Sequence, residues 1–172
     1  IDVAKPRTRR PLSTRRRIAF SVIALLIVLV PMDLLLGSWK RTQHKRVRTG
    51  AGIKHPSYHH GLERRYKGDH LWGETILYPL TTNSLGMKDR AIREVPPVGD
   101  RPRIVFIGDS FTEGLGYPYD ETFVGRIDTA VGKQGIEVLN AGRSSFCPKL
   151  YYLRVKYLLE MEKLKFEHLA VF

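Results

Sequence analysis

The chain has 172 residues and a formal net charge of +12, and its single cysteine, Cys147, excludes both an internal disulfide framework and a zinc site built from several cysteines. The charge is concentrated at one end: residues 1–54 hold 13 Lys and Arg against 2 acidic residues, whereas residues 55–172 hold 16 against 15. A basic folded surface, and with it a nucleic-acid partner, is therefore not expected.

The N-terminal region predicts a basic tail followed by one membrane-spanning helix. Residues 1–17 carry seven Lys and Arg among Pro, Ser and Thr, are too polar to bury a core, and are expected to be disordered. Residues 18–39 form the predicted span, because about 19 almost wholly apolar residues would rise roughly 28 Å as a helix, the thickness of the hydrocarbon core. Three polar or helix-breaking residues interrupt the apolar run: Ser21, Pro31 and Asp33. Trp39 and Lys40 follow, where an interfacial anchor belongs.

Three interpretations of this apolar segment stay open: a retained signal anchor, a cleaved signal peptide, or a buried helix of a soluble protein. The signal anchor is favoured, because residues 34–38 offer no Ala-x-Ala cleavage pattern and the run is long for a signal peptide. Basic residues flank both ends, so the positive-inside rule barely separates the two orientations. The slight excess before the span favours a cytoplasmic N-terminus.

Residues 40–100 are predicted to be a juxtamembrane linker and a lead-in to the domain that follows. Residues 40–70 show neither helical nor strand periodicity. Four histidines in this region match no metal-ligand spacing and indicate a solvated loop, so no metal site is predicted; they are His55, His59, His60 and His70. A short strand is expected over residues 72–78, followed by a turn at Asn83-Ser84 and Gly86.

Residues 101–172 alternate strands and helices, which predicts βαβ units and a parallel sheet. Strands are expected at residues 104–107, 136–139 and 168–172. Between them, one helix should begin after Asp120 as its N-cap, and another should cover residues 148–164. The charged side chains of that second helix, including Arg154, are expected to face mostly solvent.

Ser110 is the candidate nucleophile, because it follows a buried strand directly and ligand sites of open α/β sheets lie beyond the carboxyl ends of such strands. Gly108 lets the backbone turn before it, and Asp109 is expected to organise this turn by accepting loop N–H groups. Two other interpretations compete. Gly-Asp-Ser also suits a simple strand-exit turn, and the glycines suggest a phosphate-binding loop, although no Lys-Ser/Thr follows Gly114.

A second motif, Asn140-Ala141-Gly142, supports the interpretation of Gly108-Asp109-Ser110 as part of an active site. Gly108-Asp109-Ser110 after an apolar strand, followed about thirty residues later by Asn140-Ala141-Gly142, resembles the first two sequence blocks of the SGNH (GDSL-like) hydrolase family. The resemblance implies a flavodoxin-like three-layer α/β fold and a serine esterase or O-acyltransferase acting on carbohydrate or lipid acyl esters, with no cofactor. It also implies that Ser110 is the nucleophile and that the backbone N–H groups of Ser110 and Gly142 donate to the oxyanion.

The family's third block, an Asn, and its last block, Asp-x-x-His, are absent from these 172 residues. The chain is therefore expected to be the N-terminal part of a longer protein, with an incomplete hydrolase domain over residues 101–172. Cys147, a lone cysteine with no histidine partner, is expected to be a small buried hydrophobic residue. His168 precedes a strand and is not predicted to act as the base. A non-catalytic, membrane-tethered module that binds glycans or proteins is the alternative.

The segment from Asn83 to Arg90 resembles a lead-in found in membrane-linked members of the family. Its polar residues Asn83, Lys88 and Arg90 either line the mouth of the substrate site or tie the lead-in to the domain, and the second interpretation is favoured. By the same resemblance, the protein is expected to be single-pass, with the hydrolase domain outside the cytoplasm.

Overall fold

The computed structural model describes residues 13–46, 51–73 and 75–172, and the chain divides into two compact units, residues 1–48 and 49–172. Side chains are described for all of these residues except 39–46. Of the tail predicted to be disordered over residues 1–17, residues 1–12 lie outside the described residues, whereas residues 14–17 are helical and belong to the first helix, which corrects that prediction. The interfacial anchor predicted at Trp39 and Lys40 concerns side chains that are not described.

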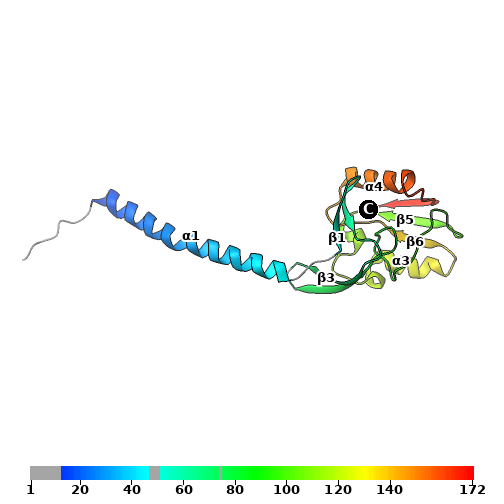
Figure 1. Ribbon diagram of the computed structural model, residues 1–172, viewed down its shortest axis with the longest axis horizontal. Helices are drawn as coiled ribbons and strands as arrows, with labels where there is room; N and C mark the ends of the chain where they lie inside the picture. The colour runs from blue at the N-terminus through cyan, green and yellow to red at the C-terminus, as the bar shows by residue number, and fades with distance from the viewer. Residues whose placement is uncertain (1–12, 47–50, 74) are drawn as a thin grey trace, which may run out of the picture. The chain divides into compact units, whose positions relative to one another are not determined.

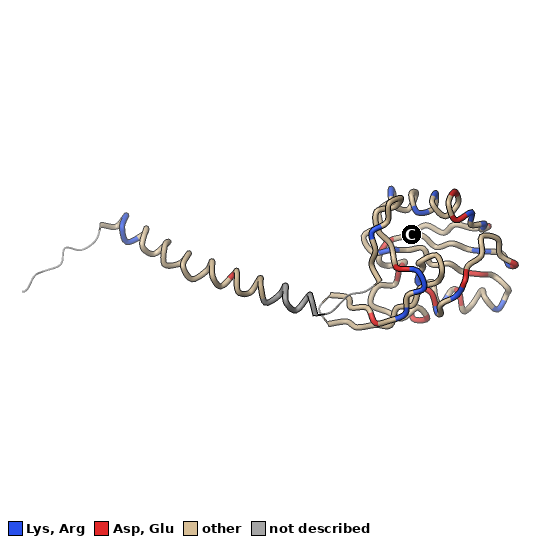
Figure 2. Tube along the Cα trace, viewed as in Figure 1, with Lys and Arg blue, Asp and Glu red and all other residues tan. Residues whose placement is uncertain are grey.

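The first unit contains one helix, α1 (Thr14–Arg46). Its apolar side chains from Ile18 to Leu36 are exposed around the whole helix, a distribution typical of a helix that faces lipid. Among the described residues this is the one helix that is long and apolar enough to cross a membrane, over Thr14–Ser38. Asp33 is the acidic residue within this stretch. In the second unit, basic and acidic residues are interspersed along the chain (Figure 2).

Two antiparallel hairpins open the second unit. Strand β1 (Gly52–His55) pairs with β2 (His59–Leu62), and β3 (Lys67–Trp72) pairs with β4 (Ile76–Thr81). This differs from the predictions of a linker over residues 40–70 and of one strand over residues 72–78, which in fact contain a hairpin turn. The strands are short and half-exposed, so their apolar periodicity is too weak to read from the sequence.

A three-stranded parallel sheet forms the rest of the unit, as predicted. Strand β5 (Arg103–Ile107) lies in the centre, between β6 (Glu137–Asn140) and β7 (His168–Val171). The helical elements are the short α2 (Ser110–Glu113), the 3-10 turn η1 (Tyr119–Glu121), α3 (Phe123–Gly132) and α4 (Pro148–Glu160). Side chains of β5 alternate between two cores, and Figure 1 shows α3 and α4 covering opposite faces of the sheet. Val105 and Ile107 lie in the core with Leu158 of α4, and Phe106 lies in the core with Val124 of α3.

The turn predicted between the hairpins and the sheet is confirmed. The Asn83 side-chain oxygen accepts hydrogen bonds from the N–H groups of Leu85 (3.0 Å) and Met87 (3.2 Å), and Gly86 adopts a φ of +66°. The chain then runs antiparallel to β6, where Lys88 bridges to Asn140. The lead-in is therefore part of the domain's edge.

Two details of the helices correct the sequence analysis. The N-cap of α3 is Thr122, whose hydroxyl accepts from Gly125 N–H at 3.0 Å, because Asp120 lies within η1 and binds Arg90 instead. Arg154 of α4 is buried and donates to Leu85 O at 2.8 Å and to the Tyr58 hydroxyl. Its partners belong to the turn and hairpin that pack over α4, so local sequence gave no indication of its burial.

Candidate active site

Ser110 is the first residue of α2, directly beyond the carboxyl end of β5. Asp109 caps this helix: its side chain accepts from Phe111 N–H at 2.9 Å, which is the turn-organising contact that the sequence predicts. As the first helical residue, Ser110 has an N–H group with no acceptor inside the helix. Within the described residues, the half-buried Ser110 hydroxyl has no hydrogen-bond partner.

The structure brings the two sequence blocks together. The parallel pairing of β5 and β6 continues past both strands, because Ala141 N–H donates to Phe106 O (2.8 Å) and Arg143 N–H donates to Gly108 O (3.0 Å). The Asn140 amide also donates to Thr112 O at 2.8 Å. The turn that carries Gly142 is thereby fixed against the helix that carries Ser110.

Glycine is required at both turns because their backbones lie against α2. A Cβ at Gly108 would lie 2.1 Å from Thr112 Oγ1, and a Cβ at Gly142 would lie 2.7 Å from both Thr112 Cβ and Glu113 N. Either side chain would push the turn away from the helix. The two glycines of the motif thus have a direct steric role in the site.

The Gly142 N–H group donates to the side-chain oxygen of Asn140, 3.1 Å away. An oxyanion at this position would compete with that oxygen for the same hydrogen. The Ser110 N–H group faces no such competition among the described residues. Their oxyanion roles stay predictions.

Glu113 is a site residue that sequence reasoning missed. Its carboxylate is fully buried and accepts from Arg143 Nη1 (2.8 Å) and from Ser144 N–H (2.5 Å). A buried carboxylate needs such partners, because an unpaired charge costs several kcal/mol. Glu113 therefore binds the loop after Gly142 to the helix of Ser110. The sequence feature that could have indicated this contact is Arg143, the basic residue directly after Asn140-Ala141-Gly142.

Lys88 and Arg90 tie the lead-in to the domain, as the favoured interpretation holds, whereas the side chain of Asn83 bonds within the lead-in itself. The buried Lys88 ammonium donates to Gly114 O (2.7 Å) and Tyr117 O (2.5 Å), and it lies 5.0 Å from the ring centre of Tyr78. Asn83 donates to Asp89 at 3.0 Å, and Arg90 binds Asp120 at 2.6 Å. Lys88 thus fixes the loop that follows α2.

Lys88 should make stability depend on alkaline pH. Burial lowers its pKa from 10.5 to about 8, although the nearby Glu113 acts in the opposite direction. Between these values the unfolded chain binds more protons than the folded one, so the free energy of unfolding rises with pH by roughly 3 kcal/mol at most. Denaturant unfolding at pH 7, 8.5 and 10 should show this rise in the wild type relative to Lys88→Met. The same pH dependence of the free energy of unfolding in both proteins would contradict it.

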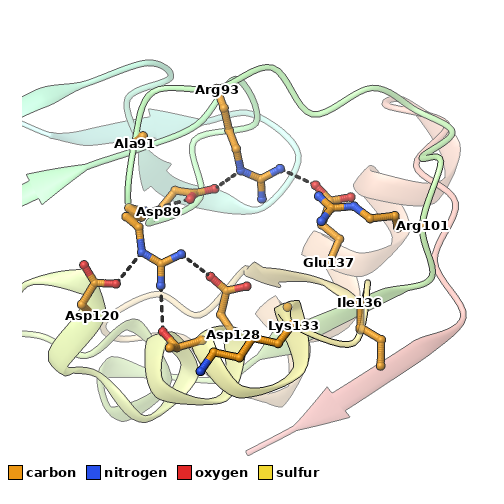
Figure 3. Close-up of a pocket in the computed structure, with 12 residues that line it drawn as sticks. Asp89, Ala91, Arg93, Arg101, Asp120, Asp128, Lys133, Ile136 and Glu137 are labelled. Atoms are coloured by element: carbon orange, nitrogen blue, oxygen red, sulfur yellow. Dashed lines mark hydrogen bonds and ion pairs between the residues drawn. The ribbon is translucent and has the colours of Figure 1, made fainter.

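A pocket of about 560 Å³ adjoins Ser110. Another, of about 670 Å³, lies between the lead-in and α3 (Figure 3). In that second pocket Arg93 binds Asp89 and Glu137, and Arg90 binds Asp120 and Asp128. Both arginines are thus paired with carboxylates, so we take the Ser110 pocket as the candidate active site.

Among the described residues that line the Ser110 pocket there is no histidine. His70 is buried on β3 with its ring against Tyr78, so the prediction of a solvated loop was wrong for this residue. His55, His59 and His60 line a separate pocket of about 910 Å³ together with Cys147. Cys147 is exposed, so the prediction that it is a buried hydrophobic residue was wrong. His168 begins β7 opposite Ile104, whereas Ser110 lies beyond the other end of the sheet. Among the described residues, no group of three or more His, Cys, Asp or Glu is placed to hold a metal ion.

Comparison of the chain with protein families, with characterised proteins and with solved structures gives no match. The class that the fold defines is a mixed α/β protein with a small parallel sheet and an N-terminal helix able to span a membrane.

Proposed function

We propose that this chain is part of a membrane-anchored serine esterase or O-acyltransferase of the SGNH type, with a flavodoxin-like domain outside the cytoplasm. One observation carries the proposal: the Ser110 turn and the Gly142 turn lie side by side beyond the carboxyl ends of adjacent parallel strands, hydrogen-bonded through Arg143 N–H and Gly108 O. Ligand sites of parallel sheets form at such places.

In the proposed reaction, the Ser110 oxygen attacks the carbonyl carbon of an acyl ester and its proton passes to a general base. The alcohol leaves, and the acyl group is then transferred from Ser110 to water or to a sugar hydroxyl. Ser110 N–H and Gly142 N–H would stabilise the oxyanion, and loss of one such donor typically costs about 3 kcal/mol of barrier. The resemblance assigns the base to an Asp-x-x-His block, which these 172 residues do not contain.

Fluorophosphonate labelling of the full-length protein tests the proposal, because this probe reacts with serines that a base and an oxyanion hole activate. We expect labelling of the wild type and none of Ser110→Ala. Ser57→Ala is the matched control, since this exposed serine lines a different pocket and should leave labelling intact. Circular dichroism verifies that each variant is folded. Equal labelling of Ser110→Ala and the wild type would overturn the assignment.

A non-catalytic SGNH-like binding module is the second candidate. The bond from Gly142 N–H to Asn140 Oδ1 favours it, because that donor is already occupied. A folded wild-type protein that takes up no fluorophosphonate would support this candidate against the enzyme.

A further inference from the structure

Four aromatic residues surround the pocket beside Ser110. They come from separate segments: Trp72 ends β3, Phe111 lies in α2, Tyr117 follows that helix and Phe123 begins α3. Their exposed fractions are 45%, 82%, 55% and 36%, respectively. Large aromatic side chains are usually buried, and several exposed around one concave site indicate a binding surface.

The wall that Trp72 forms is held in place by its neighbours. Gly116 adopts a φ of +89°, and a Cβ there would lie 2.7 Å from Trp72 Cε3, so the indole packs directly on the glycine backbone. Lys88 fixes the same loop through Gly114 O and Tyr117 O. The hairpin therefore contributes a preorganised side to the pocket.

The charges around the pocket exclude an anionic ligand. No Lys or Arg is among the described residues that line the pocket. The one acidic side chain among them is the exposed Glu121, whose carboxylate bonds to no described residue. Two cations of the surrounding site are paired with other groups, since Arg143 binds Glu113 and Lys88 binds the backbone oxygens of Gly114 and Tyr117. A phosphate or sugar acid would meet a carboxylate without a counter-charge.

The lining also distinguishes a sugar from an acyl chain. Among the described residues that line the pocket, the aliphatic side chain is that of Leu115, whereas a chain-binding site would be lined by several such residues. The faces of aromatic rings carry partial negative charge and attract the C–H groups of a saturated ring. Glu121 and the Ser144 hydroxyl can accept from ring hydroxyls at the rim.

We propose that this pocket is a subsite for a neutral sugar, which stacks on Trp72, Phe111 and Tyr117 and presents its ester to Ser110. The inference rests on the proposed function for the role of the subsite. Binding itself requires no turnover, so it can be measured in a Ser110→Ala background whether or not the enzyme assignment survives.

Trp72 fluorescence provides the test, because this chain has two tryptophans and Trp39→Phe leaves Trp72 alone. The Ser110→Ala, Trp39→Phe chain is titrated with mono-O-acetylated cellobiose, with its uronic acid counterpart and with methyl octanoate. We expect a saturable change with the acetylated cellobiose, about tenfold weaker binding in Phe111→Ala and Tyr117→Ala, and at least tenfold weaker binding of the acid.

Tyr152→Ala is the matched control: this exposed tyrosine lies on α4, does not line the pocket, and should leave the affinity unchanged. Three outcomes would overturn the inference: no saturable change with acetylated cellobiose in folded protein, tighter binding of methyl octanoate or of the acid, or equal loss of affinity in Tyr152→Ala and Tyr117→Ala.

Discussion

Glu113→Gln is expected to slow fluorophosphonate labelling of Ser110 about a hundredfold and to lower the free energy of unfolding by about 3 kcal/mol. Glu113 accepts from two donors, Arg143 Nη1 and Ser144 N–H, and it is fully buried. A glutamine has one acceptor oxygen, so either a buried guanidinium or a buried N–H loses its partner. The loop after Gly142 then loosens from the helix of Ser110, which displaces the Gly142 donor.

Labelling rates of the folded protein separate this positioning role from simple destabilisation. Glu160→Gln is the control, because its exposed carboxylate lies on α4 and makes one long ion pair, 3.9 Å from Lys156. Adding Arg143→Met to Glu113→Gln removes the stranded cation and should restore part of the stability but not the labelling rate. If folded Glu113→Gln protein is labelled at the wild-type rate, Glu113 does not position the Gly142 loop relative to Ser110.

The parallel sheet could be predicted because its strands are buried on both faces. Val105, Phe106 and Ile107 form a continuous apolar run. The Gly-Asp-Ser turn that follows it and the later Asn140-Ala141-Gly142 segment together form a pattern that can be recognised in the sequence. Each of these features lies within a few residues of the chain. Local sequence therefore sufficed for the sheet, and for the position of Ser110.

The hairpins and the buried charges could not be predicted, because their stability depends on distant partners. Arg154 donates to Leu85 O, 69 residues earlier, and Lys88 donates to Gly114 O, 26 residues later. A lysine or arginine in a polar segment usually indicates solvent exposure, and only the fold supplies the acceptors that make burial tolerable. The place of Trp72 beside the Ser110 pocket could not be predicted either, because its indole packs on Gly116, which is distant in the sequence.

Arg103→Met is expected to lower the free energy of unfolding by about 3–5 kcal/mol at pH 7. The Arg103 side chain is 1% exposed and donates to Glu137, to Pro96 O (2.7 Å) and to Pro97 O (3.3 Å). It thereby joins β5 to β6 and to the end of the lead-in. Methionine fills similar volume but leaves Glu137, which also binds Arg93, with a single cation.

The loss of free energy of unfolding in Arg103→Met should be smaller at low pH, and this pH dependence would identify the charge of Glu137 as its source. Burial alone would raise the pKa of Glu137, but the hydrogen bonds from Arg103 and Arg93 outweigh burial and hold the pKa below its ordinary value of 4.5. Its stabilising contribution is therefore present above pH 4.5 and is lost as the pH falls through the lower folded-state pKa. In Arg103→Met that pKa rises toward its ordinary value, so Glu137 protonates at a higher pH than in the wild type. The difference in the free energy of unfolding between the variant and the wild type should therefore be smaller at pH 4 than at pH 7.

Arg101→Met is the matched control for chemical unfolding at both pH values. Arg101 is 49% exposed and lies 3.8 Å from Asp100, so its removal should cost no more than about 1 kcal/mol. Equal losses in the two variants would refute a special role for Arg103. Because Arg103 begins β5 and Ser110 follows its other end, the folded fraction of Arg103→Met should still label at the wild-type rate. Stability of the sheet and reactivity of the serine would then be separable properties of one strand.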